Sequence, residues 1–319
     1  MEGYLGVDVG SVSTNLVVLD GGGEVAASVY HRTRGNPIGA VQEGMKQLGS
    51  QLPSDIEVKA AGTTGSARYL SGVIVGADIV KNEITAHAVA AMHIIPEVRT
   101  VLEIGGQDSK IILLQDGVVV DFAMNTVCAA GTGSFLDHQA VRLGIPIEEF
   151  GDYALRAERE VQIAGRCSVF AESDMIHKQQ VGHPPEGIIY GLCQALVRNY
   201  LNNLAKGKRI EEPVVFQGGV AANRGMKRAF EEALGTGVIV PEHFNVMGAV
   251  GAALLAREAE VQKTRFKGFE VSEMDFKTSS FHCGGCSNTC EVVRITVGGE
   301  ELARWGGRCG KWELEPQAG

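Results

Sequence analysis

The chain has 319 residues, of which 45% are hydrophobic, and its formal net charge is −9. This length and composition allow a sizeable core in two lobes or one large domain, and no apolar run reaches the roughly 18 residues that span a bilayer. Because no block of Lys or Arg accompanies the acidic balance, we expect no nucleic acid partner. We expect an unprocessed cytoplasmic protein without a membrane segment.

The N-terminal segment predicts a meander of three strands over residues 4–30, with a Gly/Ser turn and a Gly-rich turn between the strands. Residues 100–124 repeat this pattern of apolar runs and glycines. A gapless alignment of the two segments places Asp8 on Glu103, Gly10 on Gly105, and Ser11 on Gly106. Because an acidic residue precedes the turn at the same offset in both, we interpret them as two copies of one unit.

Apolar spacing predicts helices between and after the repeats, at residues 37–49, 83–95, 131–145, 168–180 and 185–207. A strand enters a turn at residues 57–66, and two further strand and helix pairs follow at 213–235 and 238–260. Strands that alternate with helices indicate an α/β fold in which helices cover the sheets.

We expect three parts along the chain. The first lobe covers residues 1–95, with the option that its last helix comes from the C-terminal part, and the second lobe covers residues 96–260. The sequence becomes polar from about Val261, so residues 261–319 are expected to be a linker and a small cysteine module.

No Walker A pattern occurs in the chain, but three other segments are suited to hold a nucleotide. The first is a tight turn with hydroxyl groups and a carboxylate that suits hydrated Mg²⁺, made by Asp8, Gly10, Ser11, Ser13 and Thr14. The second is its repeat, with Gly105, Gly106, Gln107 and Asp108, which we expect to close on the same phosphates. The third is a strand-to-helix turn that lets a base or sugar approach the backbone, with Gly218, Gly219, Val220 and Asn223.

In this order the three segments resemble the phosphate-one, phosphate-two and adenosine motifs of the superfamily that includes actin, hexokinase, heat-shock chaperone ATPases and acetate kinases. The resemblance implies two ribonuclease-H-like lobes with ATP and Mg²⁺ in the cleft between them. By analogy with other nucleotide hydrolases, Asp8 holds Mg²⁺ through water, and Ser11, Ser13 and Thr14 contact phosphates. Gln107 or Asp108 orients the attacking water.

Seven cysteines, an odd number, argue against a disulfide framework and favour metal binding or thiol chemistry. Cys128 and Cys167 each precede a predicted helix, where the partial positive charge of the helix N-terminus favours an anionic group. Burial as small hydrophobic side chains is the alternative for both residues, and packing is the expected role of Cys193 within the long apolar helix.

The segments IGGQDSK (104–110), NTVCAAGTGSFLD (125–137) and CSVFAES (167–173) resemble the activator ATPases of 2-hydroxyacyl-CoA dehydratases and related subunits of benzoyl-CoA reductase. The resemblance implies that Cys128 and Cys167 bind one [4Fe–4S] cluster shared across a homodimer, each subunit giving two thiolates. It further implies that reduced ferredoxin or flavodoxin supplies an electron and that ATP drives its transfer to an iron–sulfur acceptor enzyme. A dehydratase, a reductase or a double-cubane cluster protein is such an acceptor.

The C-terminal cysteines have the spacing of four thiolate ligands: Cys283, Cys286, Cys290 and, after a further stretch, Cys309. Zn²⁺ and a second iron–sulfur cluster both fit this spacing, and reduced solvent-facing thiols are the alternative. The segment resembles the cysteine segment of larger, multi-domain activases of the same family.

Two other functions remain open on the sequence. A sugar or carboxylate kinase of the same fold would leave Cys128 and Cys167 without a role, and a redox or metal sensor would use mainly the C-terminal cysteines. His87 lies four residues after Glu83, a spacing that suits a metal or a proton carrier, but we expect a structural role for it.

Overall fold

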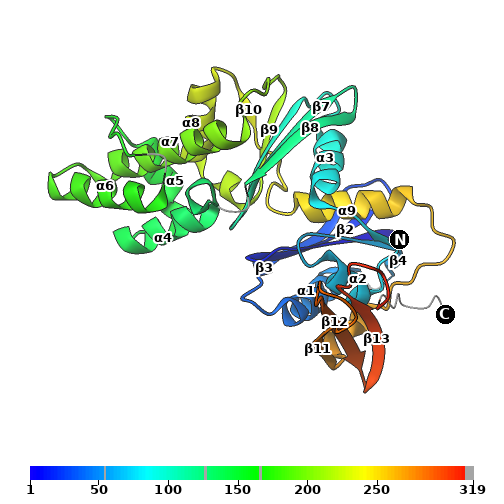
Figure 1. The fold of residues 1–319 in the computed structure, drawn as a ribbon. Coiled ribbons are helices and arrows are strands. Elements are labelled where there is room, and N and C mark those ends of the chain that lie inside the picture. The colour runs from blue at the N-terminus through cyan, green and yellow to red at the C-terminus, as the bar shows by residue number, and fades with distance from the viewer. Residues whose placement is uncertain (54, 126–127, 165–166, 313–319) are drawn as a thin grey trace. The chain divides into compact units, whose positions relative to one another are not determined.

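The structure is a computed structural model that describes residues 1–53, 55–125, 128–164 and 167–312. The chain divides into two compact units, of which unit 1 comprises Met1–Asn82 with Ala252–Gly319 and unit 2 comprises Glu83–Gly251. Each unit contains a five-stranded sheet (Figure 1).

The sheet of unit 1 begins with the predicted meander. Its strands are β1 (Glu2–Val9), β2 (Ser13–Asp20), β3 (Val25–Arg32), β4 (Glu57–Thr64) and β5 (Ile79–Val80). Strands β1 to β3 are antiparallel, while β4 and β5 run parallel to β1, which gives the order β3-β2-β1-β4-β5. The helices of this unit are α1 (Pro37–Gln51), α2 (Arg68–Val75) and the C-terminal part of α9 (Met247–Glu258).

The sheet of unit 2 has the same topology. Its strands are β6 (Thr100–Ile104), β7 (Ser109–Gln115), β8 (Val118–Asn125), β9 (Val214–Gln217) and β10 (Val238–Ile239). They lie in the order β10-β9-β6-β7-β8, with β6 to β8 antiparallel and β9 and β10 parallel to β6. The helices are α3 (Glu83–Ile94), α4 (Gly133–Leu143), α5 (Ile147–Leu155), α6 (Ser168–Gln180), α7 (Pro185–Leu204) and α8 (Arg224–Leu234), with short 3₁₀ helices η1 (Ala129–Gly131) and η2 (Gly219–Ala222).

The strand registers confirm the gapless alignment of the two repeats. Asp8 pairs with Asn15 across β1 and β2, and Glu103 pairs with Lys110 across β6 and β7. Each member of the second pair follows its counterpart by the same number of residues, so the duplication extends from sequence to hydrogen-bonded pairing.

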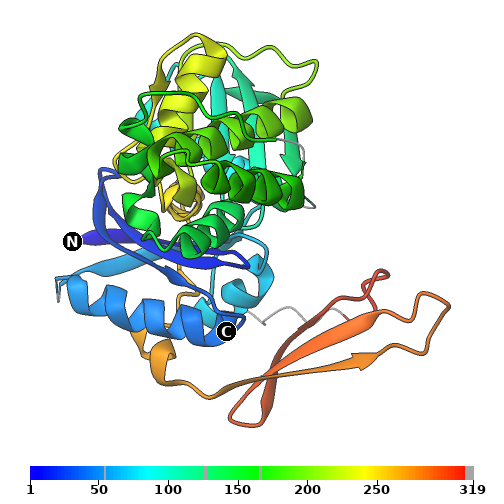
Figure 2. The ribbon, with the colours of Figure 1, turned by 90° about the vertical axis from the view of Figure 1, so that its left-hand side faces the viewer.

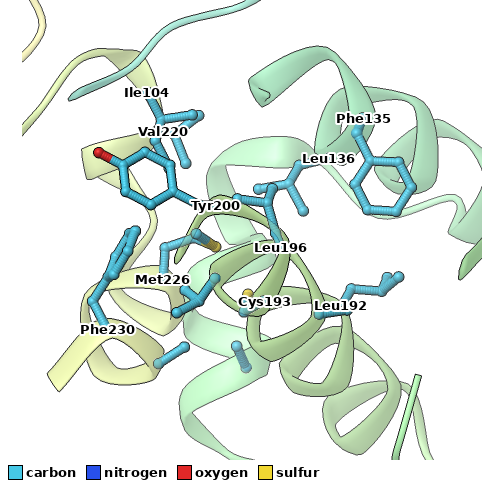
Figure 3. Packing of buried hydrophobic residues seen from close by; sticks show 14 of the residues in the cluster. Ile104, Phe135, Leu136, Leu192, Cys193, Leu196, Tyr200, Val220, Met226 and Phe230 are labelled. Carbon is cyan, nitrogen blue, oxygen red and sulfur yellow. The ribbon is translucent and has the colours of Figure 1, made fainter. Parts of the chain in front are cut away.

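The core of unit 2 is built around helix α7 (Figure 3). The Tyr200 ring meets the Phe230 ring edge to face at a centroid distance of 5.3 Å, and Cys193 is fully buried nearby, as expected for a packing residue. Burying a large apolar side chain stabilises a fold by about 1.5–3 kcal/mol. The Tyr200 hydroxyl donates a 2.6 Å hydrogen bond to the Lys110 carbonyl, which fixes the core to the second repeat.

The polar segment after α9 folds against unit 1 before it enters the terminal sheet. Its 3₁₀ helix η3 (Phe269–Glu273) buries Val271 in the unit 1 core, and Gln42 donates hydrogen bonds to the carbonyls of Val271 and Met274. The polar composition of this segment predicted a linker. It packs against unit 1 instead, because a few apolar residues are spaced among the charged ones.

A three-stranded antiparallel sheet follows, made of β11 (Phe276–His282), β12 (Glu291–Val297) and β13 (Glu300–Trp305) (Figure 2). Within the described part of the chain, no helix combines the length and apolarity needed to cross a bilayer.

Candidate functional site

The first repeat forms a tight turn between β1 and β2. The Gly10 N–H donates to the Ser13 carbonyl at 2.9 Å, and the Thr33 hydroxyl donates to the Gly10 carbonyl at 2.9 Å. The Thr14 hydroxyl lies 2.9 Å from the Thr33 hydroxyl and is fully buried, so it stabilises the turn, which differs from the phosphate contact expected from the sequence. Ser11 is exposed and Ser13 half-buried, which leaves their hydroxyls available to a ligand.

Strand β4, which pairs with β1, brings a glycine against the Asp8 carboxylate. Gly65 follows β4 and has a φ of +93°, and a Cβ there would lie 2.6 Å from Asp8 Oδ1 and 2.5 Å from the Val9 carbonyl oxygen. Thr64, which is in register with Asp8, has a buried hydroxyl without a hydrogen-bond partner among the described residues. Only glycine allows this close approach, and the unpaired hydroxyl beside the carboxylate suits a hydrated cation or a phosphate.

The second repeat is held by a buried ion-pair network. Lys110 Nζ lies 2.9 Å from Glu103 Oε2, 2.9 Å from Glu83 Oε2 and 3.0 Å from Asp108 Oδ2, with the Lys110 side chain only 2% exposed. Burial disfavours the ammonium, but the three carboxylates outweigh it and hold the pKa of Lys110 well above its usual value. Burial raises the pKa of Glu103 to about 8, although Lys110 acts in the opposite direction.

His87 is buried beside this network. Its Nδ1 accepts a 2.8 Å hydrogen bond from Gln217 Nε2, which connects α3 to the end of β9. Burial, followed by the charge of Lys110, lowers the pKa of His87 to about 3, while Glu83 acts in the opposite direction. The imidazole is therefore neutral and fixes an orientation, in agreement with the structural role expected for it.

The third predicted motif lies where β9 ends. Gly218 has a φ of +90°, and a Cβ there would lie 2.7 Å from Glu103 Oε1 and 2.5 Å from the Ile104 carbonyl oxygen. Gly219 and Val220 form the 3₁₀ helix η2, and the Asn223 side chain accepts from the Met226 N–H to cap α8. Gly218 thus approaches Glu103 as Gly65 approaches Asp8, which extends the duplication to the fourth strand of each repeat.

Helix α4 is bonded directly to the second turn. The Gly133 N–H donates to the Gly105 carbonyl at 2.9 Å, and the Ser134 N–H donates to the Gly106 carbonyl at 2.8 Å. Gln107, at the tip of the same turn, is exposed, whereas Asp108 is paired with Lys110. The first N–H groups of a helix have no partner within it, so the two turn carbonyls satisfy them.

Cys128 and Cys167 both stand at helix starts. Cys128 precedes η1 and is framed by Asn125, whose Oδ1 accepts from the Cys128 N–H at 2.9 Å and whose Nδ2 donates to the Cys128 carbonyl at 2.8 Å. Cys167 is the N-cap of α6 and its side chain makes no capping bond. Both cysteines are half-buried, so neither is a packing residue of the core.

Exposed apolar side chains flank both cysteines. Val169 and Phe170, directly after Cys167, are 66% and 67% exposed. On the edge strand β8, which leads towards Cys128, every second residue is apolar and at least 40% exposed: Val118, Val120, Phe122 and Met124. A row of exposed apolar residues on an edge strand marks an interaction surface.

The terminal cysteines lie at the end of the small sheet. Cys283 is buried, Cys290 is half-buried, and Cys286 and Cys309 are exposed. Hydrogen bonds from the Trp312 indole and from the Gly285 N–H lower the pKa of the Cys283 thiol. Over the described ranges, no three His, Cys, Asp or Glu side chains are already grouped as a metal site.

Two residues at the site were not assigned from the sequence. Gly65 belongs to a strand that was predicted to enter a turn. The signal that the sequence offers is a glycine at the end of this strand, and its positive φ in the structure explains why a glycine stands there. Lys110 ends the IGGQDSK segment and pairs with Glu103 across β6 and β7. A lysine at the start of an otherwise apolar strand is the sequence signal for a buried ion pair.

The family model that matches this chain is described as the BadF/BadG/BcrA/BcrD ATPase family and covers residues 5–256. The chain belongs to this family. The matched range ends before the terminal cysteines, so the sheet β11–β13 lies outside it.

Among curated relatives, the chain is 38% identical over 263 residues to the activator of lactoyl-CoA dehydratase of Anaerotignum propionicum, covering 81% of this chain and 99% of the relative. It is 35% identical over 263 residues to the 2-hydroxyisocaproyl-CoA dehydratase activator of Clostridioides difficile, covering 79% and 94%. The expected resemblance to dehydratase activators is thereby confirmed.

The solved structures confirm the fold. The activator of the 2-hydroxyisocaproyl-CoA dehydratase from Clostridium difficile with bound ADPNP has a TM-score of 0.75 at 33% identity, over 81% of this chain and 95% of that one. A glucokinase of Streptomyces griseus has a TM-score of 0.52 at 14% identity, over 80% and 99%, and shows the fold alone. The chain therefore has the actin and hexokinase type of ATPase fold, with two five-stranded sheets and a small terminal sheet.

Proposed function

We propose that this protein is an ATP-hydrolysing activator that delivers low-potential electrons to an iron–sulfur partner enzyme. Membership of an ATPase family and the relatives named as dehydratase activators support the ATP-dependent activator role. The single observation that carries the electron-transfer part is the pair Cys128 and Cys167, half-buried cysteines at two helix starts beside exposed apolar side chains.

The two repeats hold ATP and Mg²⁺ in this proposal, which the ADPNP bound to a related activator supports. Asp8 holds Mg²⁺ through water, while Ser11, Ser13 and the turn backbone contact phosphates and Thr14 keeps the turn in shape. Of the two residues expected to orient the attacking water, Gln107 is the better placed. It is exposed at its turn, whereas the Asp108 carboxylate is paired with Lys110.

The adenosine part of the nucleotide contacts the turn after β9 in this proposal. Gly218 and Gly219 let a ring approach the backbone, with Val220 and Asn223 beside them. Gln217 Oε1, at the end of β9, and Ser109 Oγ, at the start of β7, lie on the two strands that flank β6 and are buried without hydrogen-bond partners among the described residues. Unpaired buried oxygens next to the proposed nucleotide support a polar ligand there.

The donor set fits an iron–sulfur cluster shared between two copies of the chain. A [4Fe–4S] cluster takes four thiolates and supplies one-electron transfer when bound, and each chain offers Cys128 and Cys167. Both lie at helix N-termini, where backbone N–H groups favour an anion. The exposed Val169 and Phe170 beside Cys167 supply apolar area for a homodimer contact.

Nucleotide state is coupled to Cys128 through helix α4. The Gly105 and Gly106 carbonyls accept the first N–H groups of this helix, and Cys128 lies five residues before Gly133. A turn that moves when MgADP replaces MgATP therefore pulls on the segment that carries Cys128. Coupling between two sites in one protein is typically about 1–3 kcal/mol, which is enough to change exposure and redox potential of a bound group.

Reduced ferredoxin or flavodoxin is the donor and a cysteine-rich dehydratase, a reductase or a double-cubane cluster protein is the acceptor in this proposal. Each turnover moves one electron from donor to acceptor at the expense of ATP hydrolysis. The cytoplasm, where low-potential donors are kept reduced, is the compartment that suits this chemistry.

Iron binding in cysteine variants tests the proposal. Anaerobic reconstitution with iron and sulfide should give a dimer in which Cys128→Ala or Cys167→Ala removes about four irons per dimer relative to the wild type. Cys193→Ala is the matched control, because this cysteine of the same unit is fully buried in the core. Equal iron content in all four proteins would show that the chain is not an electron-transfer activator, and a kinase of the same fold would then account for the ATPase family.

A further inference from the structure

Four cysteines meet at one end of the terminal sheet. Cys283 follows β11 and Cys290 precedes β12, and the Cys283 N–H donates to the Cys290 carbonyl at 2.8 Å, so the two residues face each other as the next pair of the ladder. Cys286 lies in the loop between them. Strand β13 runs antiparallel to β12 with Trp305 opposite Val293, so its end returns to the same edge and leads to Cys309.

The segment from Cys283 to Cys286 bends so that a backbone N–H points at the Cys283 sulfur. The Gly285 N–H lies 3.4 Å from Cys283 Sγ, and the Trp312 indole N–H lies 3.0 Å from the same atom. A neutral thiol is a weak acceptor, whereas a thiolate accepts such bonds well. Trp312 lies three residues after Cys309, so its bond to Cys283 also closes the terminal segment onto the cysteine loop.

The sheet buries few apolar side chains, and most of them join the core of unit 1. Phe276, Ile295 and Ala303 belong to that core, whereas Val292, next to the cysteines, is fully buried outside it and β11 is exposed along most of its length. Among the described residues, the end of the sheet that carries the cysteines therefore has little apolar packing to hold it. A structural metal supplies a further constraint in small domains, because the free energy of metal binding adds to that of folding.

We propose that Cys283, Cys286, Cys290 and Cys309 bind one Zn²⁺ ion as a tetrahedral tetrathiolate that fixes the terminal sheet. Facing residues of an antiparallel pair have Cβ atoms about 5 Å apart, and a tetrahedral Zn²⁺ with bonds of about 2.3 Å holds its sulfurs roughly 3.8 Å from each other. Cys283 and Cys290 therefore provide one edge of the site. Cys286 and Cys309, exposed in short turns, close on the ion when it binds, since the ligands are not grouped beforehand.

Zn²⁺ fits this position better than a second iron–sulfur cluster. The facing cysteines lie close together, which suits a single small ion, and the ligand spacing of two, three and eighteen intervening residues is typical of structural zinc sites. The site does not depend on the activator function proposed above, because it lies outside the residues that match the ATPase family.

Metal content of the full-length chain tests the site. Cys128→Ala/Cys167→Ala removes the other proposed ligands, and in this background purification with Zn²⁺ should retain about one Zn²⁺ per chain by elemental analysis. Replacing it by Co²⁺ should produce the strong visible bands of tetrahedral thiolate coordination. Cys290→Ser and Cys309→Ser should each abolish these bands, whereas Ser287→Ala in the same loop should leave them unchanged.

Two results would overturn the proposal. One is a fully reduced protein that retains no Zn²⁺ and leaves all four thiols reactive to a thiol reagent in its presence. The other is uptake of about four irons with sulfide at this site in place of Zn²⁺. If the serine variants fail to fold, hydrogen exchange of β12 in the unsubstituted module decides the question, because Zn²⁺ must slow the exchange if it fixes the sheet. Either result leaves the iron count at Cys128 and Cys167 as a separate measurement.

Discussion

Acid should destabilise unit 2 through His87. This side chain on α3 is 6% exposed, and its pKa is lowered to about 3 by burial and then by Lys110. In the unfolded chain a histidine has a pKa of about 6.5. Because the folded-state pKa is depressed, the proton binds preferentially to the unfolded chain, so the stability is complete above about pH 6.5 and is lost as the pH falls towards 3.

The size of the loss follows from the two pKa values. At pH 5, which is about 1.5 units below the pKa of the unfolded-state histidine, protonation stabilises the unfolded chain by about 2 kcal/mol. The folded chain gains almost nothing, because its pKa is still lower. Glu103, whose pKa is raised to about 8, acts with the opposite sign, since its contribution is present at low pH and is lost as the pH rises. Because a His87→Gln variant retains Glu103, the difference from the wild type isolates the histidine.

Urea unfolding followed by far-ultraviolet circular dichroism between pH 8 and pH 5 measures this difference, and hydrogen exchange of α3 assigns the transition to unit 2. The wild type should lose about 2 kcal/mol more than His87→Gln over this range. His93→Gln is the matched control, because His93 is exposed on the same helix and should leave the wild-type pH dependence intact. Parallel pH profiles for the wild type and His87→Gln would refute the buried neutral imidazole.

Four further predictions address the nucleotide site. Asp8→Ala should abolish ATP turnover and leave the iron content unchanged, as measured by phosphate release and iron analysis, because it removes the proposed Mg²⁺ partner and leaves both cysteines in place. Gly65→Ala should lower stability by about 2 kcal/mol or more and also abolish turnover, since its Cβ would meet backbone and the Asp8 carboxylate. Lys110→Met should cost about 3–5 kcal/mol in urea unfolding, against less than about 0.5 kcal/mol for Lys227→Met in an exposed pair. Ser134→Pro removes an N–H in the first helical turn, where proline is tolerated, and should weaken the effect of MgATP on chelation of the bound iron while ATP hydrolysis persists.

The sequence predicted most of the fold because the duplicated hairpins carry local signals. Glycine turns between apolar runs define each meander, and the fixed offset between Asp8 and Glu103 survives in the strand registers. Helix α5 escaped prediction, because its nine residues mix apolar and acidic side chains over little more than two turns. The docking of η3 escaped as well, since its few apolar residues are hidden in a charged segment.

The candidate site was predicted only as far as its motifs are contiguous. Gly65 lies far from Asp8 along the chain, and only the parallel pairing of β4 with β1 brings them together. Lys110 on strand β7 was visible as a motif residue, but its partner Glu83 belongs to helix α3. Contacts of this kind depend on the tertiary arrangement, which a pattern of glycines and carboxylates does not specify.

The two repeats have kept one backbone plan and differ in what surrounds their acidic residues. Asp8 is half-buried and lies beside the Thr64 hydroxyl, which has no hydrogen-bond partner among the described residues, whereas Glu103 is buried against Lys110. A carboxylate buried this deeply is poorly placed to receive a hydrated cation, so the first repeat is the one that we propose for Mg²⁺. The second repeat has instead a rigid base and two carbonyls bonded to α4, the helix that follows Cys128. A turn that is held by the Lys110 ion pairs and also bonded to a helix transmits a displacement to that helix, so in the proposed mechanism nucleotide exchange at this repeat acts on the segment that carries Cys128.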